Sequence, residues 1–298
     1  MSAGTHDAGF LHIEDLYKSY GPKCVLDNID LSVQQGEICT VVGPSGCGKS
    51  TLLRQILGEE FPDRGRVSIR GRDVGYPDPR RGIVFQRYSL FPHLSVLDNV
   101  MLGRLLPLGL AARLRRRREF RDEAMGYLER VRLAAHADKY PHELSGGMQQ
   151  RVAIAQSLIL KPEILMMDEP FGALDPDTRE QMQVFLLELW EREKMTIFFV
   201  THDLEEAVYL GTRILVLSQY YSDARGEGPG INRGAKIVSD YRLPRAASAT
   251  DVKRSAEFTE LVERIRREGF DPAFRRHVKE FNLQHPHSFR TLTAEEAG

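Results

Sequence analysis

The fold of this chain is decided by one glycine-rich stretch, Gly43-Pro44-Ser45-Gly46-Cys47-Gly48-Lys49-Ser50-Thr51. It fits the pattern G-x-x-x-x-G-K-[ST], in which glycines let the backbone wrap so that several N–H groups point at one anion. The apolar, β-branched run before it, residues 38–42, is typical of a strand buried on both faces of a parallel sheet. A helix is expected over residues 51–57, ended by Gly58. The sequence therefore predicts a phosphate-binding loop between a buried strand and the positive end of a helix.

The residues after the glycines predict the chemistry of this loop. We expect the Lys49 ammonium to hold the β- and γ-phosphates of a nucleotide and the Ser50 hydroxyl to bind Mg²⁺. A second apolar strand, residues 164–167, ends at Asp168 and Glu169. Two carboxylates there are costly unless they face a cation or water, and this edge of an α/β sheet is where ligands bind. Asp168 is therefore expected to bind Mg²⁺, directly or through water, and Glu169 to orient and polarise the attacking water.

The pattern of elements on both sides of these strands predicts an α/β fold. Residues 10–16 and 29–33 alternate apolar and polar side chains, as half-buried strands do. A helix over residues 176–193 separates the strand at 164–167 from an apolar strand at 196–200, and this order indicates a parallel sheet. Residues 95–160 are helical in pattern and suggest an inserted subdomain. Other strands are expected at residues 67–69, 83–85, 214–217 and 235–239.

The C-terminal part, from residue 219 on, changes character. Residues 222–230 form a glycine-rich loop for which the sequence suggests no role. One helix face carries Phe258, Leu261, Val262 and Ile265, with Gly269 as the end of that helix. A second helix is expected to begin at Asp271-Pro272 and to bury Phe274, Val278 and Phe281. The last ten or so residues look frayed, and His285 and His287 are expected to be surface residues rather than metal ligands.

Composition limits the classes of protein to which the chain can belong. It has 298 residues, 42% of them hydrophobic, and 41 Lys and Arg against 42 Asp and Glu, a net charge of −1. Such a chain is neither disordered nor globally basic like many nucleic-acid-binding proteins. No apolar run approaches the roughly 20 residues of a membrane-spanning helix, and the N-terminus lacks the pattern of a secretory signal. The three cysteines form no CxxC pair and are expected to be reduced thiols.

A second motif decides the family. The octapeptide Leu144-Ser145-Gly146-Gly147-Met148-Gln149-Gln150-Arg151 precedes Asp168 and resembles the LSGGQ signature of ATP-binding cassette (ABC) ATPases, with Met148 where many members have Gln. Ser145, Gly146 and Gly147 would open a helix whose N–H groups face outward. The resemblance implies that this helix end binds the γ-phosphate of an ATP held by the opposite subunit, so that two copies of the chain sandwich two ATP molecules head to tail.

The resemblance also implies roles for single residues. Tyr20 is similar to the aromatic residue that stacks on adenine, although Tyr17 is a rival candidate and either could be a strand-packing tyrosine. Gln86 resembles the glutamine that contacts Mg²⁺ and the attacking water and couples the site to a membrane partner. Asp175 ends a stretch, Gly172-Ala173-Leu174-Asp175, that resembles the loop crossing the dimer interface. His202 resembles the switch histidine that holds the γ-phosphate.

Several features resemble importers rather than exporters. There is one cassette without a membrane span, and the segment before the signature lacks the Gly- and Glu-rich loop of exporter cassettes. Residues 87–96 resemble the segment that lines a groove for a permease helix, and the whole pattern is most similar to the nitrate/sulfonate/taurine importer group. This implies a transmembrane permease, indirectly a solute-binding protein, and a peripheral place on the cytoplasmic face of the inner membrane. Nitrate, sulfonates, taurine and small nitrogen compounds all remain open as cargo.

The sequence disfavours two other classes of function. A soluble ABC ATPase that acts on nucleic acid or ribosomes usually has coiled coils, zinc insertions or two cassettes, which this sequence lacks, so no nucleic acid is expected. A regulatory module without turnover is disfavoured because Lys49, Glu169 and His202 occur together.

The resemblance implies a P-loop NTPase (RecA-like) core over residues 10–243, with an antiparallel β subdomain and an inserted α-helical subdomain at about residues 95–160. Residues 244–298 would be a short helical C-terminal extension. The arginine run from Arg113 to Arg118 is either a solvated helix face or a contact with anionic lipid or the membrane partner.

Overall fold

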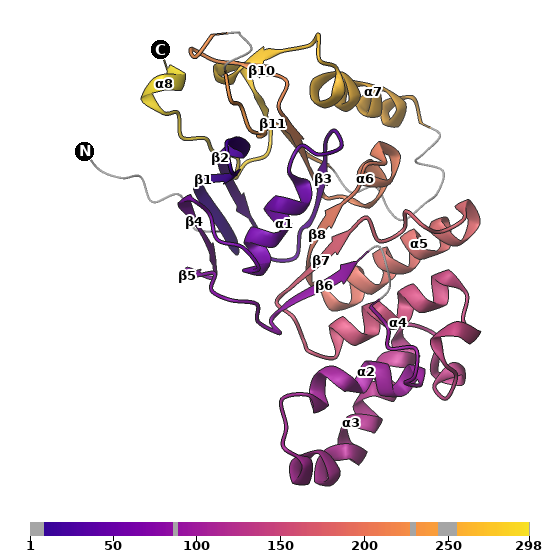
Figure 1. Cartoon of the computed structure of the whole chain (residues 1–298). Coiled ribbons are helices and arrows are strands. Elements are labelled where there is room, and N and C mark those ends of the chain that lie inside the picture. The colour runs from indigo at the N-terminus through magenta and orange to yellow at the C-terminus, as the bar shows by residue number, and fades with distance from the viewer. Residues whose placement is uncertain (1–8, 86–88, 227–230, 244–254, 298) are drawn as a thin grey trace. The chain divides into compact units, whose positions relative to one another are not determined.

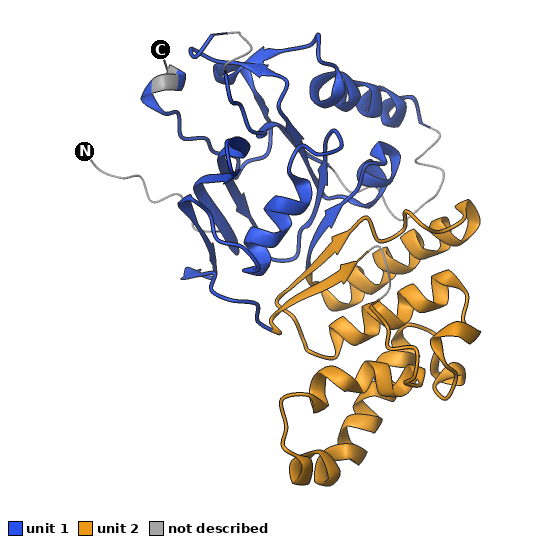
Figure 2. Ribbon diagram, in the orientation of Figure 1, with its two compact units in different colours: residues 1–78, 196–298 blue, residues 79–195 orange. Residues whose placement is uncertain are grey.

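The structure is a computed structural model that describes residues 9–85, 89–226, 231–243 and 255–297 (Figure 1). It consists of two compact units, residues 1–78 with 196–298 and residues 79–195 (Figure 2). The first unit contains β1 (Leu11–Tyr20), β2 (Lys23–Val33), β3 (Ile38–Val42), α1 (Lys49–Leu57), β4 (Arg64–Ile69), β5 (Arg72–Asp73), β8 (Thr196–Val200), α6 (Leu204–Leu210), β9 (Arg213–Ser218), β10 (Tyr221–Ser222), β11 (Lys236–Arg242), α7 (Ala256–Phe270), β12 (Arg276–His277), β13 (Asn282–Leu283) and α8 (Ala294–Ala297). The second contains β6 (Arg81–Phe85), α2 (Val96–Leu105), α3 (Leu110–Arg130), α4 (Gly146–Leu158), β7 (Ile164–Asp168) and α5 (Pro176–Glu193).

The first unit has an antiparallel sheet in the order β2-β1-β4-β5. Leu11 pairs with Val33 of β2 and with Ile69 of β4, so β1 lies in the middle of the sheet. Along β1, Leu11, Ile13 and Leu16 are buried, whereas the intervening residues are partly exposed. The half-buried strand predicted at residues 10–16 and the antiparallel β subdomain are confirmed. Residues 29–33 form part of β2 as predicted, but all five are buried, so the half-buried pattern expected there is wrong.

A second sheet in this unit runs in the order β13-β11-β9-β3-β8. Strand β3 is parallel to both β8 and β9, and all five residues of β3 and of β8 are buried. The predicted doubly buried parallel strands are therefore confirmed. Strand β11 runs antiparallel to β9, as the return after the glycine-rich loop predicted. The phosphate loop follows β3, at the carboxyl edge of this sheet.

The second unit combines one parallel strand pair with four helices. Strands β6 and β7 pair in register from Arg81 with Ile164 to Phe85 with Asp168. Helix α2 packs against both α3 and α4. Buried side chains from these helices, such as Val100, Phe120 and Ile154, form the apolar interior. Within the described residues of the chain, no helix is long and apolar enough to cross a membrane.

The C-terminal extension lies on the cassette, and part of its prediction is wrong. Helix α7 buries Phe258, Val262 and Ile265 in a cluster with residues of β9, β11 and α6, as its periodicity predicted. The second helix, expected from Asp271-Pro272, does not form. Instead, the chain forms a turn, the strand β12, a short 3-10 helix (Val278–Glu280) and the strand β13. Strand β12 pairs with β10 and β13 with β11, so strand pairing replaces the local helical preference.

The expectation of a frayed C-terminus is also wrong. The backbone N–H of Thr291 donates to Asp30, and Lys236 forms a buried ion pair with Glu296 at 2.5 Å between Nζ and Oε1. His285 is not a surface residue, because only 6% of it is exposed and its Nε2 lies 3.1 Å from Oε1 of Glu37. Burial by itself would raise the pKa of Glu37, but hydrogen bonds from His285 and from the Gln34 N–H, together with the Arg213 charge, lower it.

A buried arginine ties these last residues to the sheet. Arg213 of β9 is fully buried and forms a two-pronged ion pair with Asp240 of β11, at 2.8 Å from Nε to Oδ1 and 2.5 Å from Nη2 to Oδ2. Its Nη1 also donates to the Ser32 carbonyl at 2.5 Å. On the other side, Asp240 accepts from the Ser288 hydroxyl through its carboxylate and from the Gln284 N–H through its backbone carbonyl. One ion pair therefore connects β2, β9, β11 and the C-terminal segment.

Candidate nucleotide-binding site

The phosphate loop is shaped by close backbone contacts. A side chain at Gly43 would place its Cβ 2.0 Å from the Leu217 carbonyl oxygen, so only glycine lets the loop pass the end of β9. Gly48 has a φ of 111°, and its Cβ would lie 2.9 Å from side-chain atoms of Val25 and Leu26. These glycines hold the loop at the N-terminus of α1, which starts at Lys49, two positions earlier than predicted. Backbone N–H groups at the start of a helix are donors for an anion.

The Lys49 side chain lies along the inside of this loop. Only 7% of Lys49 is exposed, and its Nζ donates to the carbonyl oxygens of Gly43 at 2.7 Å and Pro44 at 3.0 Å. An ammonium has three protons, so one donor is left for a phosphate oxygen in this orientation. Ser50 is exposed on the first turn, whereas Cys47 and Thr51 are buried. Burial raises the pKa of the Cys47 thiol despite the nearby Lys49 charge, so Cys47 is a neutral packing residue.

Tyr20 is better placed than Tyr17 to offer a ring to a base. Tyr20 ends β1 with 43% of its surface exposed, and its hydroxyl donates to Glu60. Glu60 also accepts from Arg54 of α1 at 3.3 Å, which connects Tyr20 to the helix after the loop. The Tyr17 ring is half-buried under the Arg64 guanidinium, 5.0 Å from the ring centre, and burial raises its pKa. Tyr17 therefore matches the strand-packing alternative.

His202 lies at the same sheet edge as the phosphate loop. It follows β8, whose residue Val200 pairs with Val41 of β3, two positions before Gly43. The preceding Thr201 is buried, and its hydroxyl donates to Oε2 of Glu206 at 2.6 Å. Asp203 caps α6 by accepting from the N–H groups of Glu205 and Glu206. Because its neighbours are fixed in this way, the exposed His202 projects from a rigid turn.

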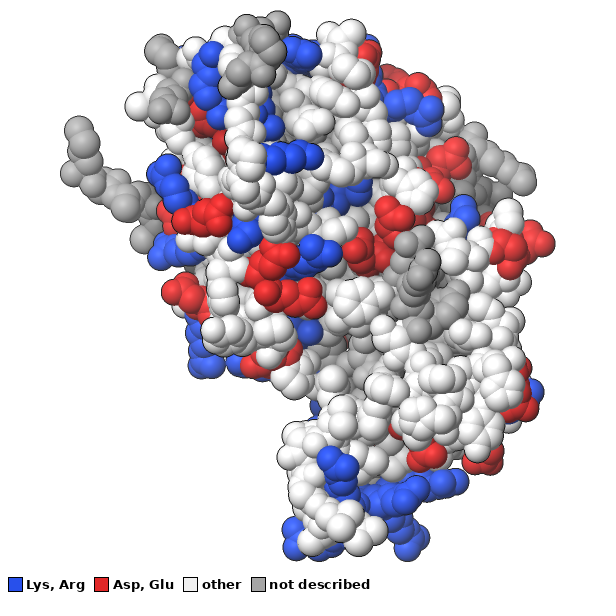
Figure 3. Space-filling view, viewed as in Figure 1, with Lys and Arg blue, Asp and Glu red and all other residues white. Residues whose placement is uncertain are grey.

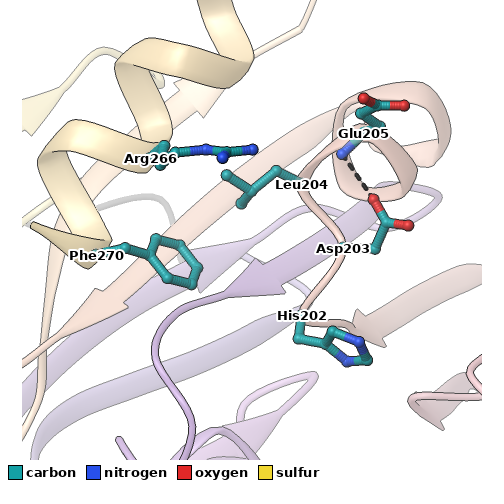
Figure 4. A pocket seen from close by; sticks show the side chains of 6 residues that line it. All are labelled: His202, Asp203, Leu204, Glu205, Arg266 and Phe270. Carbon is teal, nitrogen blue, oxygen red and sulfur yellow. Dashed lines mark hydrogen bonds between the residues drawn. The ribbon is translucent and has the colours of Figure 1, made fainter.

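A pocket of about 560 Å³ borders this turn (Figure 4). Figure 4 shows Arg266 and Phe270 of α7 pointing toward the segment from His202 to Glu205. The C-terminal extension therefore forms one wall of the space beside His202, which no pattern in the sequence predicted. The pocket is lined by His202, Asp203, Leu204, Glu205, Arg266 and Phe270.

The two candidate acidic residues, Asp168 and Glu169, lie at the end of strand β7 in the second unit. Asp168 is the last residue of β7 and pairs with Phe85 of β6, the residue before Gln86. Gln86 itself lies outside the described residues. Glu169 has a φ of 47°, and its carbonyl accepts from the Gly172 N–H at 3.2 Å, so the chain turns sharply after the strand. A non-glycine residue held at positive φ is typical of functional sites.

The signature and Asp175 each open a helix of the second unit. Ser145 is exposed and caps α4 by accepting from the Met148 N–H at 3.4 Å, while Gly146 and Gly147 form its first turn. The predicted helix opening is confirmed. Asp175 caps α5 by accepting from the Thr178 N–H at 3.0 Å. This hydrogen bond lowers the pKa of Asp175, so its carboxylate is charged at neutral pH.

The buried side-chain amide of Asn99 holds the segment from Phe91 to Ser95, and no pattern in the sequence predicted this role. Asn99 of α2 is fully buried, and its Nδ2 donates to the carbonyls of Phe91, Leu94 and Ser95 at 3.0–3.1 Å. Its Oδ1 accepts from the Phe91 N–H at 2.8 Å. The segment from Phe91 to Ser95 is therefore held in one conformation, yet 43% of Phe91 is exposed. A fixed, exposed aromatic side chain is suited to contact another protein.

The residues present fit a magnesium nucleotide. The glycine cradle and the helix N-terminus provide backbone N–H donors for phosphate, and Lys49 adds a charged donor. The Ser50 hydroxyl and the Asp168 carboxylate are the oxygen ligands that Mg²⁺ prefers. Within the described residues, no group of three or more His, Cys, Asp or Glu side chains forms a metal cluster.

Comparison with known proteins gives one consistent result. The sequence profile of the ABC transporter family matches residues 26–172. The nitrate import ATP-binding protein NrtD of Synechococcus elongatus is 39% identical over 252 residues, which cover 83% of this chain and 88% of that protein. The taurine import ATP-binding protein TauB of Rhizobium johnstonii is 42% identical over 247 residues, covering 81% and 87%. Among solved structures, CbiO1 from Clostridium perfringens, part of the ABC transporter complex CbiONQ, matches with a TM-score of 0.63 and 29% identity over 70% of this chain and 84% of that one.

Proposed function

This chain belongs to the ATP-binding subunits of ABC transporters, and on that premise we propose that it hydrolyses ATP to drive solute import through a separate permease. The observation that carries the proposal is the loop from Gly43 to Ser50, closed by backbone contacts around the Lys49 ammonium at the start of α1. Similarity to import subunits over more than 80% of the chain supports the direction of transport.

In the proposed reaction, Lys49 and the N–H groups at the start of α1 hold the β- and γ-phosphates of ATP. Glu169 orients a water molecule and accepts its proton as the water oxygen bonds to the γ-phosphorus. The bond from the γ-phosphorus to the bridging oxygen breaks, and ADP and phosphate leave. His202 holds the γ-phosphate during this step, and Gln86 contacts the attacking water. Mg²⁺, held by Ser50 and Asp168 with Gln86, would neutralise charge on the β- and γ-phosphates.

A second copy of the chain would complete each site. Ser145 and Gly146 open α4 at the surface, Gly147 is buried in its first turn, and we propose that these three residues bind the γ-phosphate of the opposite subunit. Asp175 would contact the partner at the same interface, and Tyr20 would stack on the adenine base within its own subunit. The ATP γ-phosphate then joins the two chains, and its hydrolysis separates them.

The cargo is proposed from the relatives alone. The nitrate, taurine and bicarbonate import proteins to which the chain is similar point to a small anion or a small nitrogen or sulfur compound. Binding to a permease would place the chain at the cytoplasmic face of the membrane, and a solute-binding protein would deliver the cargo to that permease.

Removal of the Lys49 charge by substitution tests the proposed reaction. We expect the purified chain to hydrolyse ATP steadily with Mg²⁺, and we expect Lys49→Ala to lower kcat/KM at least about 100-fold, because a charged donor to the reacting phosphate is lost. Lys161→Ala is the matched control, since Lys161 is an exposed lysine that pairs with Glu123. Equal activity of the Lys49→Ala variant and this control would overturn the role of the loop.

The exposed Phe91 provides a test of the permease contact. Asn99 holds the backbone of the Phe91 loop, so Phe91→Ala removes an apolar contact without releasing the loop. We expect this variant to hydrolyse ATP at the parental rate but to lose several-fold in affinity for the permease, as truncation of a central aromatic residue does. Solute uptake and ATP hydrolysis measured together would show this, and unchanged uptake would exclude Phe91 from the contact.

A further inference from the structure

The N-terminal half of α3 carries side chains that its own packing does not explain. The buried residues of α3 are Phe120, Ala124, Tyr127 and Leu128, so none of residues 110–119 is buried. Yet Leu110 and Leu114 in this half are 75% and 67% exposed, and Leu106 in the preceding turn is 59% exposed. Single exposed leucines are ordinary, but three on neighbouring turns form a patch.

The same half of the helix is strongly basic. Residues 104–121 contain seven arginines and one glutamate. Some of these arginines have local partners, since Arg116 pairs with Glu119 at 2.7 Å and Arg113 donates to the Leu106 and Leu108 carbonyls. By contrast, across the part of the chain that the structure describes, no carboxylate lies within ion-pair distance of Arg115, Arg118 or Arg121.

Two of the leucines and two of the arginines share one side of the helix. At 100° per residue, Leu110, Leu114, Arg118 and Arg121 fall within about a quarter-turn of one another, and Arg115 lies about 60° beyond Arg118. We call the surface of these five residues, together with Leu106 in the turn before the helix, the α3 tip. Figure 3 shows blue side chains gathered at the lower end of the view, where Figure 1 labels α3, with white surface beside them.

We propose that the α3 tip is a docking surface for a bilayer that contains anionic phospholipid. Leucines beside a row of arginines are the pattern by which a helix lies at a membrane interface, with its apolar side chains among the acyl chains and its cations at the headgroups. A merely solvated face explains the arginines but not the leucines. A nucleic acid would need aromatic or polar base contacts that the tip lacks. Since the whole chain has a net charge of −1, attraction to an anionic surface is local to this tip.

This inference is independent of the proposed ATPase function, because the tip shares no residue with the proposed nucleotide site. Its consequence is a second contact with the membrane, additional to the permease, that would orient the second unit at the bilayer. Each arginine near an anionic surface contributes about a 5-fold gain in partitioning, and the contribution is screened by salt.

The test is sedimentation of the purified full-length chain with vesicles, in the absence of any other protein. We expect the chain to bind vesicles of equal parts phosphatidylcholine and phosphatidylglycerol at low salt, and to bind vesicles of phosphatidylcholine alone at least about tenfold less. Raising the salt to about 0.5 M is expected to release most of the chain. The triple variant Arg115→Gln, Arg118→Gln, Arg121→Gln is expected to lose at least about tenfold in binding.

Two further variants separate the contributions of the arginines and of the leucines to vesicle binding. The triple variant Lys23→Gln, Arg66→Gln, Arg72→Gln removes the same charge from exposed positions of the antiparallel sheet and is expected to bind like the parent. The double variant Leu110→Ser, Leu114→Ser keeps the charge and is expected to bind severalfold less, because its apolar anchor is gone. Parental ATPase activity in every variant would show that each is folded.

Two results would overturn the proposal. The first is that the parent stays in the supernatant with anionic vesicles, and the second is that the α3-tip triple variant binds vesicles as well as the sheet triple variant. If the second result were accompanied by loss of permease binding, the surface would be assigned to a protein partner instead.

Discussion

Replacing Glu169 by glutamine is expected to lower the rate of ATP hydrolysis about 100-fold or more while leaving ATP binding intact. The amide keeps the shape of the side chain but cannot accept the proton of the attacking water, and a general base contributes this much to a hydrolysis rate. Glu169 follows Asp168 at the end of β7 with its backbone held at a φ of 47°, a conformation that the substitution leaves unchanged. Because the γ-phosphate persists, the variant is also expected to accumulate as an ATP-bound dimer.

Two measurements check this expectation together. Phosphate release gives the hydrolysis rate, and size-exclusion chromatography with ATP and Mg²⁺ gives the fraction of dimer. Glu191→Gln on α5 is the matched control, because Glu191 is exposed and lies outside the proposed site. Hydrolysis at the parental rate in the Glu169→Gln variant would show that another residue activates the water.

Replacing Asp240 by asparagine is expected to destabilise the first unit by up to about 3–5 kcal/mol, because the fully buried Arg213 guanidinium loses its two-pronged charged partner and keeps the longer contact with Glu37, at 3.5 Å from Nη1 to Oε2. The same side chain accepts from Ser288, so the loss is also expected to loosen the C-terminal segment. Thermal unfolding is the measurement, with an expected fall of the midpoint by about 10 °C.

The exposed pair of Arg264 and Glu260 on α7 provides the control for this experiment. Arg264→Gln is expected to change stability by less than about 1 kcal/mol, since exposed ion pairs contribute little. The double variant Arg213→Met, Asp240→Leu is expected to recover much of the lost stability, because a buried pair replaced by apolar side chains no longer needs to be neutralised. An unfolding midpoint of Asp240→Asn equal to that of Arg264→Gln would contradict the structural role of the pair.

Short sequence patterns predicted those strands and helices whose formation depends on residues nearby in the chain. The buried strand before the phosphate loop, the helix after it, the helix opened by Ser145 and the helix from residue 176 all lie where the sequence indicated, within two residues. Each of them depends on neighbours a few positions away: apolar side chains on a strand, or a side-chain oxygen at the start of a helix. The phosphate loop with Lys49 and Ser50 belongs to this class, whereas the roles proposed for Tyr20, Gln86, Asp175 and His202 come from the family resemblance.

The C-terminal extension shows why other parts could not be predicted. Asp271-Pro272 is a good helix start, but the segment after it pairs with β10 and β11, and those pairings have no local signature. His285 looked like a surface residue because its partner, Glu37, lies at the other end of the chain. Similarly, the role of Asn99 depends on where four backbone groups of the preceding loop lie in space. Contacts between residues far apart in the sequence decided the first two cases, whereas Asn99 bonds nearby residues whose positions depend on how the loop folds.

The central claim is that this ATPase works on a membrane permease, and co-purification tests it most directly. A tagged Glu169→Gln chain would be expressed in its native host and extracted in mild detergent with ATP and Mg²⁺, which hold the complex in one state. The proteins that accompany it would then be identified by mass spectrometry. We expect a multi-span membrane protein to co-purify in amounts comparable with the tagged chain. A soluble complex with nucleic acid or ribosomes and no membrane protein would contradict it.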